Sequence, residues 1–518
     1  MPPSLESLSV ELLDRILSFV QPRSCLFHLA LVSRNFNTLV TPHLYRDVFL
    51  ESNYPSDGNR HILPFTLLML LKPSTASLVR SFTFRGDFHN EESLLADIDD
   101  NKARLPWPDH PERDNILKRL IKEISHSPEE EFEWQQQVLP RYSHQDTAIY
   151  PLLLISLPNL RRLDLQVGIF VDDFFERTFN RIARSEPPFD VKPVFTQLSD
   201  ILLVGSDHMY PTPYILFEAC CHLPAVKRLF GYRLGNEDDD PRLVPSKSAT
   251  SSIQTSEQDS KPNPGEPSAP LRKLGSGIEV LELRDSKLHY SDLPIIFGAL
   301  MSPHTLIYHI GGYCGLTSIQ TPAILSAITI HATSLHRLAI DHEEYPFNTG
   351  VGDNEIADPI SFAGFAALSH LRVAPVFLFG YEDLHNAPEP GSVAETAMVN
   401  RFLGAFPPNL ENLCITNAEF VFNMEHEHIA QVFKVLLRQK NCVPHLRELV
   451  FEGEFEQNET IGCAGEVIKI AGDVGVNARA KARIFNGYCK QRGWGWDEDV
   501  GFEAIMHSPE MVQVWPKL

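Results

Sequence analysis

Apolar side chains recur at helical spacing in the first 48 residues of the chain. The first stripe of this kind consists of Leu12, Leu13, Ile16, Leu17 and Val20. Ser9 stands just before the stripe and predicts a helix N-cap, because its hydroxyl can accept a hydrogen bond from the first helical turn. We expect this helix to end at Gln21 and Pro22.

Two further apolar clusters follow it. The second consists of Leu26, Leu29, Ala30, Val32 and Phe36, and the third of Leu39, Val40, Leu44 and Tyr45. Ser33 and Arg34 lie at the junction between them. The pattern predicts three short helices that bury one small common core.

From about residue 75 the pattern changes to Leu-x-x-Leu-x-Leu, which is typical of a strand followed by a turn or helix. The clear copies contain Leu160, Leu163 and Leu165; Ile278, Leu281 and Leu283; Leu335, Leu338 and Ile340; Leu410, Leu413 and Ile415; and Leu446, Leu449 and Phe451. Weaker copies contain Val79, Phe82 and Phe84; Leu198, Ile201 and Leu203; Val226 and Leu229; and Leu371 and Val376. Helical stretches separate them at 217–222, 294–300, 322–331 and 429–439.

This alternation predicts an α/β fold, in which an N-terminal three-helix module precedes a curved leucine-rich-repeat-like solenoid. The copies start roughly 25 to 50 residues apart, further than the 20 to 29 of ordinary leucine-rich repeats, so we expect insertions. The expected domains are a helical domain at 4–48, a first part of the array at 60–235 with a polar insertion near 89–148, a linker at 236–276, and a second part with a C-terminal cap at 277–518.

The two insertions differ in composition. Residues 236–276 are rich in Ser, Pro and charge and nearly free of large apolar side chains, which predicts disorder. Residues 89–148 combine acidic and aromatic side chains, and we expect them to be partly helical.

Charge and cysteine usage narrow the class of partner. The chain has 45 basic and 67 acidic side chains and a formal charge of −22, which argues against nucleic acid or an anionic membrane as a partner. Glu11, Asp14 and Arg15 interrupt the first apolar stripe, so it does not read as a signal peptide. Eight scattered cysteines indicate a reducing compartment, cytoplasmic or nuclear.

No motif for catalysis or for a cofactor is found. The chain has no paired Cys-x-x-Cys, no His-Glu-x-x-His, no phosphate loop and no nucleophile elbow. His426 and His428 flank Glu427, but residues two apart on a helix point to different sides. Cys220 and Cys221 are adjacent, and we interpret them as buried small apolar side chains rather than as a redox pair. We expect a non-catalytic protein without metal or cofactor.

The N-terminal segment resembles an F-box, whose pattern runs Leu-Pro-x-Glu-Leu-Leu-x-x-Ile-Leu and then an apolar helix ending in Val-Ser-Arg-x-Phe. The positions that match are Leu8, Glu11, Leu12, Leu13, Ile16, Leu17, Phe19, Leu29, Leu31, Val32, Ser33, Arg34, Phe36, Leu44 and Tyr45. Ser9 departs from the pattern, because the family usually has proline there. Residues 62–86 and 150–165 look like the joining segments of divergent F-box families of filamentous fungi.

The resemblance implies that the F-box docks on the Skp adaptor of a Skp-cullin-F-box ubiquitin ligase and that the repeats hold a protein substrate. The implied adaptor contacts are Leu8, Ser9, Glu11, Leu12, Ile16, Leu17, Leu31, Val32 and Phe36. Side chains between the strand leucines are expected on the concave, substrate-binding face: Arg162, Asp164, Arg228, Phe230, Glu282, Arg284, Arg337, Asp341, Asn412, Glu448 and Glu452. Acidic character near Glu448 favours a basic substrate segment.

Two hypotheses remain open at this stage. The first is a substrate receptor that recruits the ligase, which the intact framework of Ile16, Val32 and Phe36 favours. The second is a leucine-rich interaction scaffold whose degenerate F-box no longer recruits it, which Ser9 favours.

Overall fold

The computed structural model describes residues 8–20, 23–52, 58–86, 110–139, 148–167, 173–205, 212–235, 277–286, 288, 290–311, 321–342, 359–386, 388–389, 391–418, 427–453 and 458–482. The predicted linker at 236–276 lies outside these residues. The chain forms two compact units, residues 1–278 and 279–518.

The first unit begins with three helices, as the sequence predicts. They are α1 (Val10–Leu17), α2 (Arg23–Val32) and α3 (Arg34–Arg46). Their shared core is built from Leu13, Leu17, Leu26, Ala30, Phe36 and Val40, all at most 8% exposed. Helix α1 ends at Leu17, earlier than expected, because the next residues make tighter bonds such as Phe19 N–H to the Ile16 carbonyl at 3.0 Å.

Helix α3 leads directly into a parallel sheet. Strand β1 (Asp47–Ser52) starts at the residue after α3 ends, and the Arg80 N–H donates to the Arg46 carbonyl at 2.7 Å. The sheet continues in chain order through β2 (Ser81–Gly86), β3 (Arg162–Val167), β4 (Asp200–Gly205) and β6 (Arg228–Tyr232). A separate parallel pair joins β5 (Thr212–Pro213) to β7 (Leu234–Gly235).

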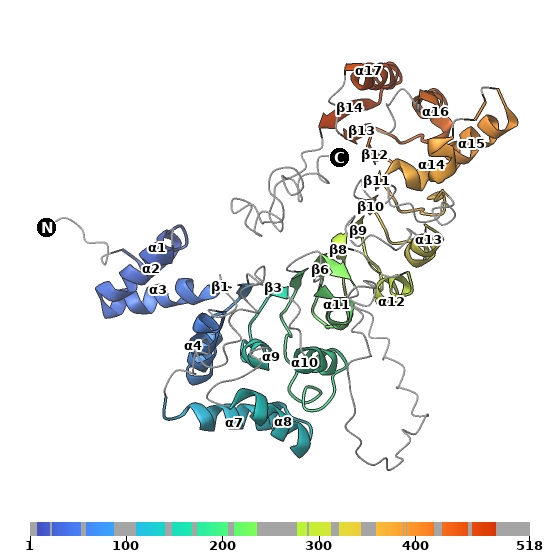
Figure 1. Ribbon diagram of the computed structural model, residues 1–518. Coiled ribbons are helices and arrows are strands. Elements are labelled where there is room, and N and C mark those ends of the chain that lie inside the picture. The colour runs from blue at the N-terminus through green and yellow to red at the C-terminus, as the bar shows by residue number, and fades with distance from the viewer. Residues whose placement is uncertain are drawn as a thin grey trace, which may run out of the picture. The chain divides into compact units, whose positions relative to one another are not determined.

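Helices connect these strands on one side (Figure 1). They are α4 (Gly58–Leu71), α5 (Pro73–Ala76), α9 (Ile149–Ile155), α10 (Asp173–Ala183) and α11 (Tyr214–Cys221). Four side chains at one register, Phe82, Leu163, Ile201 and Leu229, are fully buried between the strands and these helices. The parallel order follows from the helical crossovers, since parallel neighbours need a long connection.

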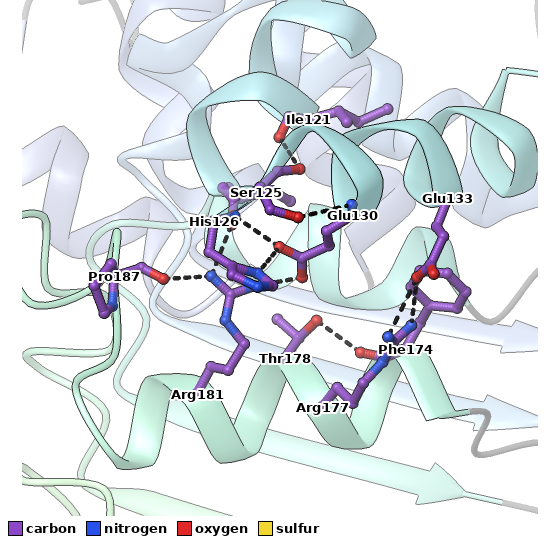
Figure 2. Close-up of polar contacts among 12 residues, drawn as sticks. Ile121, Ser125, His126, Glu130, Glu133, Phe174, Arg177, Thr178, Arg181 and Pro187 are labelled. Carbon is purple, nitrogen blue, oxygen red and sulfur yellow. Dashed lines mark hydrogen bonds and ion pairs between the residues drawn. The ribbon is translucent and has the colours of Figure 1, made fainter. Parts of the chain in front are cut away.

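The described part of the polar insertion near 89–148 is partly helical, as expected. It contains α7 (Arg113–Ile124) and α8 (Pro128–Val138). Arg181 on α10 donates to the Glu130 carboxylate of α8 and to the carbonyls of Ile124 and Pro187, so one side chain holds α7, α8 and α10 together (Figure 2). Glu130 and Arg181 have side chains only 8% and 11% exposed.

The second unit repeats the strand and helix alternation. Its parallel strands follow chain order: β8 (Val280–Ser286), β9 (Thr305–Ile310), β10 (Arg337–His342), β11 (His370–Val373), β12 (Asn412–Ile415), β13 (Glu448–Gly453) and β14 (Asn477–Ala482). Its helices are α12 (Leu293–Gly298), α13 (Thr321–Thr329), α14 (Pro375–His385), α15 (Val393–Leu403), α16 (Glu427–Arg438) and α17 (Asn458–Asp473), with a short 3₁₀ turn η5 (Lys440–Cys442).

A ladder of leucines crosses this second sheet at a single register. Its members pair in sequence as Leu281, Leu306, Leu338, Leu371, Leu413 and Leu449, and each is 0% exposed. Burying one such side chain stabilises the fold by roughly 1.5–3 kcal/mol. Next to the ladder, the rings of Phe379 and Phe402 stack with their centres 4.7 Å apart, and the ring centres of Phe433 and Phe451 lie 5.4 Å apart. These contacts pack α14, α15 and α16 on the strands.

The predicted strand positions are confirmed. Each of the nine copies of the leucine pattern contains a strand, and the four predicted helical stretches overlap α11, α12, α13 and α16. Strands β1, β5, β7, β9 and β14 were not expected from the pattern. The chain is therefore a mixed helix and strand protein with an N-terminal helical region and parallel sheet.

Candidate functional site

Helix α1 presents apolar side chains on two sides. Leu13 and Leu17 are 2% and 3% exposed in the module core, whereas Leu12 and Ile16 are 53% and 42% exposed. Ser9 caps the helix as predicted, accepting a hydrogen bond from the Leu12 N–H at 3.5 Å. The cap fixes the start of α1 and thereby the direction in which the exposed side chains point.

Helix α2 shows the same division. Leu26 and Ala30 are buried, while Phe27, Leu31 and Val32 are 52%, 67% and 67% exposed. Exposed apolar side chains are common singly on protein surfaces, but their concentration in one segment indicates a binding surface. Of the fifteen exposed large apolar side chains in the described part of the chain, seven belong to the three-helix module: Val10, Leu12, Ile16, Phe19, Phe27, Leu31 and Val32.

Polar contacts fix the three helices to one another. Ser33 caps α3 by accepting from the Phe36 N–H at 3.2 Å, and the Asn37 amide donates to the Ala30 carbonyl at 3.2 Å. His43 on α3 lies 2.7 Å from the Asp14 carboxylate on α1. These contacts hold the exposed apolar side chains of α1 and α2 on a defined scaffold.

The cap at Ser33 gives a measurable prediction. Ser33→Ala should destabilise the three-helix module by about 1 kcal/mol, because the Phe36 N–H loses its acceptor. Faster amide exchange confined to α1–α3 would be the expected sign. Exchange identical to that of the natural chain would show that the cap contributes nothing.

Glu11, one of the two acidic residues of α1, lies in its first turn. Hydrogen bonding from its own backbone N–H, and next from the Ser9 hydroxyl, holds the pKa of Glu11 below its ordinary value. Glu11 is therefore charged at neutral pH on the fully exposed side of α1, beside Leu12. The module thus offers an apolar surface with negative charge at one edge.

In the first unit, the predicted substrate-binding residues lie on one sheet face. Arg162 and Arg228 share a register with Asp200 between them, and Asp164 and Phe230 share the register two residues further along the strands. Arg228 pairs with Asp200, and this hydrogen bond raises the pKa of Arg228. Asp164 is only 1% exposed, so it does not present a free carboxylate to solvent.

In the second unit, one row brings three predicted residues together. Arg337, Asn412 and Glu448 share a register, with His370 between the first two. Glu282 is 6% exposed, and its carboxylate accepts from the Arg284 guanidinium. The predicted members Arg337, Asn412 and Glu448 are partly exposed, whereas Glu282 is enclosed.

Asp341 and Glu452 are also buried, and both carboxylates contact Arg372. Arg372 was not among the residues predicted from the sequence. The Arg372 guanidinium lies 2.5 Å from one Glu452 oxygen and 3.3 Å from Asp341. Burial alone would lower the pKa of Arg372, but the neighbouring negative charge, chiefly Glu452, outweighs it and raises that pKa. The sequence signal that could have placed Arg372 on this face is its position between Leu371 and Val373 in a weak strand copy.

The acidic end of the predicted surface is already compensated within the chain. Glu448 lies 2.8 Å from Arg479, and Glu452 is paired with Arg372. Both carboxylates are therefore already paired with an arginine of the chain, and they do not support the expected preference for a basic substrate segment at Glu448.

Glu448 carries a testable pH dependence. Desolvation raises its pKa above 4.5 despite the attraction of Arg479, so the folded state favours its protonated form. The free energy of unfolding therefore does not suffer from the burial of Glu448 below pH 4.5, and it falls as the pH rises through the raised pKa. Glu448→Gln should be more stable than the natural chain at pH 7 and lose this advantage at pH 4, as measured by urea unfolding at both values.

Glu466 provides a matched control of opposite sign. Its hydrogen bond to Lys434, at 2.6 Å, lowers the pKa of Glu466. Glu466→Gln should lower the free energy of unfolding at pH 7, and this difference from the natural chain should disappear as the pH falls. Equal pH profiles for the two variants would contradict both assignments.

Other chemistry is not assembled in the described residues. No three His, Cys, Asp or Glu side chains there gather as a metal site requires. His426 lies outside the described residues, and the His428 ring contacts the Asp383 carbonyl at 2.9 Å. Cys220 and Cys221 are fully buried, and burial raises the pKa of both thiols. Among the described helices, none has both the length and the apolar character that a membrane crossing requires.

Comparison with known proteins adds one finding for the helical module. A search of curated proteins gives no match to the chain. Residues 5–44, which include α1, α2 and nearly all of α3, match the family model of the F-box domain, so the chain carries an F-box domain at its N-terminal side.

Proposed function

We propose that the protein is a substrate-recognition subunit of a Skp-cullin-F-box ubiquitin ligase. Its F-box domain binds the Skp adaptor and, through it, cullin, and other subunits carry out ubiquitin transfer. The observation that carries the proposal is the set of exposed apolar side chains on the F-box helices α1 and α2. A stable interface of about 1,000 Å² or more needs such a surface.

The predicted adaptor-binding residues divide into three groups. Leu12, Ile16, Leu31 and Val32 are 42–67% exposed and contact the adaptor directly in this proposal. Leu17 and Phe36 are 3% and 5% exposed, and they hold the helices that carry those contacts. Leu8 packs partly on the same core, Ser9 caps α1, and Glu11 adds charge at its start.

The substrate would bind the strand face of the parallel sheet units, which we interpret as an irregular leucine-rich-repeat array. The leucine ladder and the alternation of strand and helix support this interpretation. The contacts would come from the exposed or partly exposed positions Arg162, Arg228, Phe230, Arg284, Arg337, Asn412 and Glu448. The buried positions Asp164, Glu282, Asp341 and Glu452 would support the surface rather than touch the substrate.

Ser9 favours a second candidate function, that of an interaction scaffold. Proline is usual at this position of the F-box, and its contact with the adaptor would be lost, although Ser9 preserves the helix cap. In this alternative the chain binds partners through its sheet face without recruiting the ligase.

Co-purification distinguishes the two candidates. The full chain would be expressed with the Skp adaptor and cullin, and captured through a tag on the chain. Stoichiometric recovery of both partners supports the receptor function. Recovery of the adaptor without cullin, or of neither, supports the scaffold. A Ser9→Pro variant that restores recruitment would locate the defect at that residue.

A further inference from the structure

The residue directly before each of the first three strands of the first sheet is an arginine. Arg46, Arg80 and Arg161 precede β1, β2 and β3, and we call these three residues the arginine row. Backbone hydrogen bonds align them, because the Arg80 N–H donates to the Arg46 carbonyl at 2.7 Å and the Arg161 N–H donates to the Arg80 carbonyl at 2.8 Å. Neighbouring strands lie about 4.8 Å apart, so the three backbones fall within roughly 10 Å of one another.

Neutral acceptors fix the Arg80 side chain. Its Nη1 donates to the Asn159 carbonyl at 3.3 Å and lies 3.5 Å from Gln197 Oε1. The Gln197 amide donates to Asn159 Oδ1 at 3.1 Å, and the Asn159 amide donates to the Ser77 carbonyl at 2.7 Å. The positive charge of Arg80 is therefore held in a defined place without being neutralised, which lowers the ordering cost of binding an anion.

The other two arginines of the row are exposed. Among the described residues, the guanidinium groups of Arg46 and Arg161 form neither an ion pair nor a hydrogen bond. Asp47 follows Arg46 in the chain but is not paired with it, and the Asp200 carboxylate is already bound to Arg228. The carboxylates of the adjoining strands therefore leave the arginine row with a net positive charge.

The charge of the whole chain narrows the kind of anion that fits this row. With 67 acidic and 45 basic side chains, the protein is strongly negative outside such local positive surfaces. A long polyanion such as nucleic acid would extend beyond the row and meet this negative surface. A short acidic segment can instead place its carboxylates on the arginines alone.

We propose that the arginine row binds a short, extended, acidic segment of a partner protein. Alternate side chains of an extended segment point to the same side and lie about 7 Å apart, which lets successive aspartates or glutamates reach neighbouring arginines. The Nε and Nη2 groups of Arg80, which do not contact Asn159 or Gln197, would donate to one carboxylate as a fork. Arg46 and Arg161 would bind carboxylates on either side.

This surface lies outside the predicted adaptor and substrate contacts. The interaction goes beyond the proposed receptor function and holds whether or not the chain recruits the ligase. It also differs from the basic segment that the sequence favoured near Glu448, because the unpaired charge described here is positive.

The test uses the full chain and two arrays of ten-residue peptides. The first array has Asp or Glu at every second position with varied residues between, and the second has Asn or Gln at those positions. Binders from the first array are measured in solution by fluorescence polarisation. The first variant, Arg46→Gln with Arg161→Gln, removes two charges from the row. The matched control, Arg177→Gln with Arg447→Gln, removes two charges from side chains elsewhere that are 49% and 77% exposed.

We expect binders in the acidic array and none in the neutral one. The variant of Arg46 and Arg161 should bind at least about tenfold more weakly, which is about 1.4 kcal/mol, while the control should keep its affinity to within about threefold. Both variants should melt at the temperature of the natural chain, because the replaced side chains are exposed or half-exposed. The affinity should also fall as the ionic strength rises from about 0.01 M to about 0.15 M.

Three outcomes would overturn the proposal. One is an acidic array without binders, and another is equal binding of the acidic and neutral arrays. The third is an equal loss of affinity in the two variants, which would show that acidic peptides respond to the total charge of the chain and not to the arginine row.

Discussion

Ile16→Asp and Leu31→Asp should each weaken binding of the full chain to the Skp adaptor by about 30-fold or more, without lowering the melting temperature. Ile16 is 42% exposed and Leu31 is 67% exposed in the free F-box, so a charge there costs the folded chain little. In the complex each substitution loses the burial of an apolar side chain, roughly 1.5–3 kcal/mol, and adds the desolvation of a carboxylate. Isothermal titration with purified adaptor measures the loss.

Two controls separate an interface effect from unfolding. Leu17→Asp changes a residue of the same helix that is 3% exposed, and it should unfold the F-box as well as abolish binding. Val393→Asp, at an 88% exposed apolar residue of the second unit, should alter neither. Retention of full affinity by both Ile16→Asp and Leu31→Asp would remove α1 and α2 from the adaptor interface.

Arg372→Met should destabilise the second unit by about 3–5 kcal/mol, because it leaves two nearly buried carboxylates without their cation. The side chains of Asp341 and Glu452 are 4% and 11% exposed, and Arg372 lies between them. Thr416 donates to Asp341 at 2.7 Å, but one hydroxyl does not replace the lost charge. Urea unfolding of the full chain, combined with amide exchange in β10–β13, measures the effect.

An exposed pair in the same sheet unit is the matched control for Arg372. Arg447, whose side chain is 77% exposed, lies 3.3 Å from Glu411. Arg447→Met should cost less than about 1 kcal/mol, because solvent screens such a pair. Similar losses in the two variants would show that the burial of Arg372 has no energetic consequence.

The strands were predictable because their leucines are buried at the same register of the sheet. Leu281, Leu338 and Leu413 occupy one register of a buried ladder, so each repeat carries the same spacing in the sequence. Strand β9 has Leu306 in that ladder but lacks the preceding leucine of the pattern, and β14 places Ala478 there. These strands form because neighbouring strands provide their backbone pairing partners. The local sequence alone does not indicate this pairing.

The candidate binding surface was predictable only as a set of positions. Helical spacing identified Ile16 and Leu17 together, but it did not tell which of these neighbours faces the module core. That distinction depends on how α2 and α3 pack on α1. The sequence likewise did not reveal the row formed by Arg46, Arg80 and Arg161, because these residues are distant in the chain and become neighbours only when β1, β2 and β3 pair.

Hydrogen–deuterium exchange of the full chain, with and without the Skp adaptor, shows whether α1 and α2 bind the adaptor. We expect slower exchange on adaptor binding in residues 10–32, where the exposed apolar side chains of α1 and α2 lie, and no change in strands β8–β14. Unchanged exchange in residues 10–32 at saturating adaptor would contradict the assignment of this F-box surface as the adaptor-binding site.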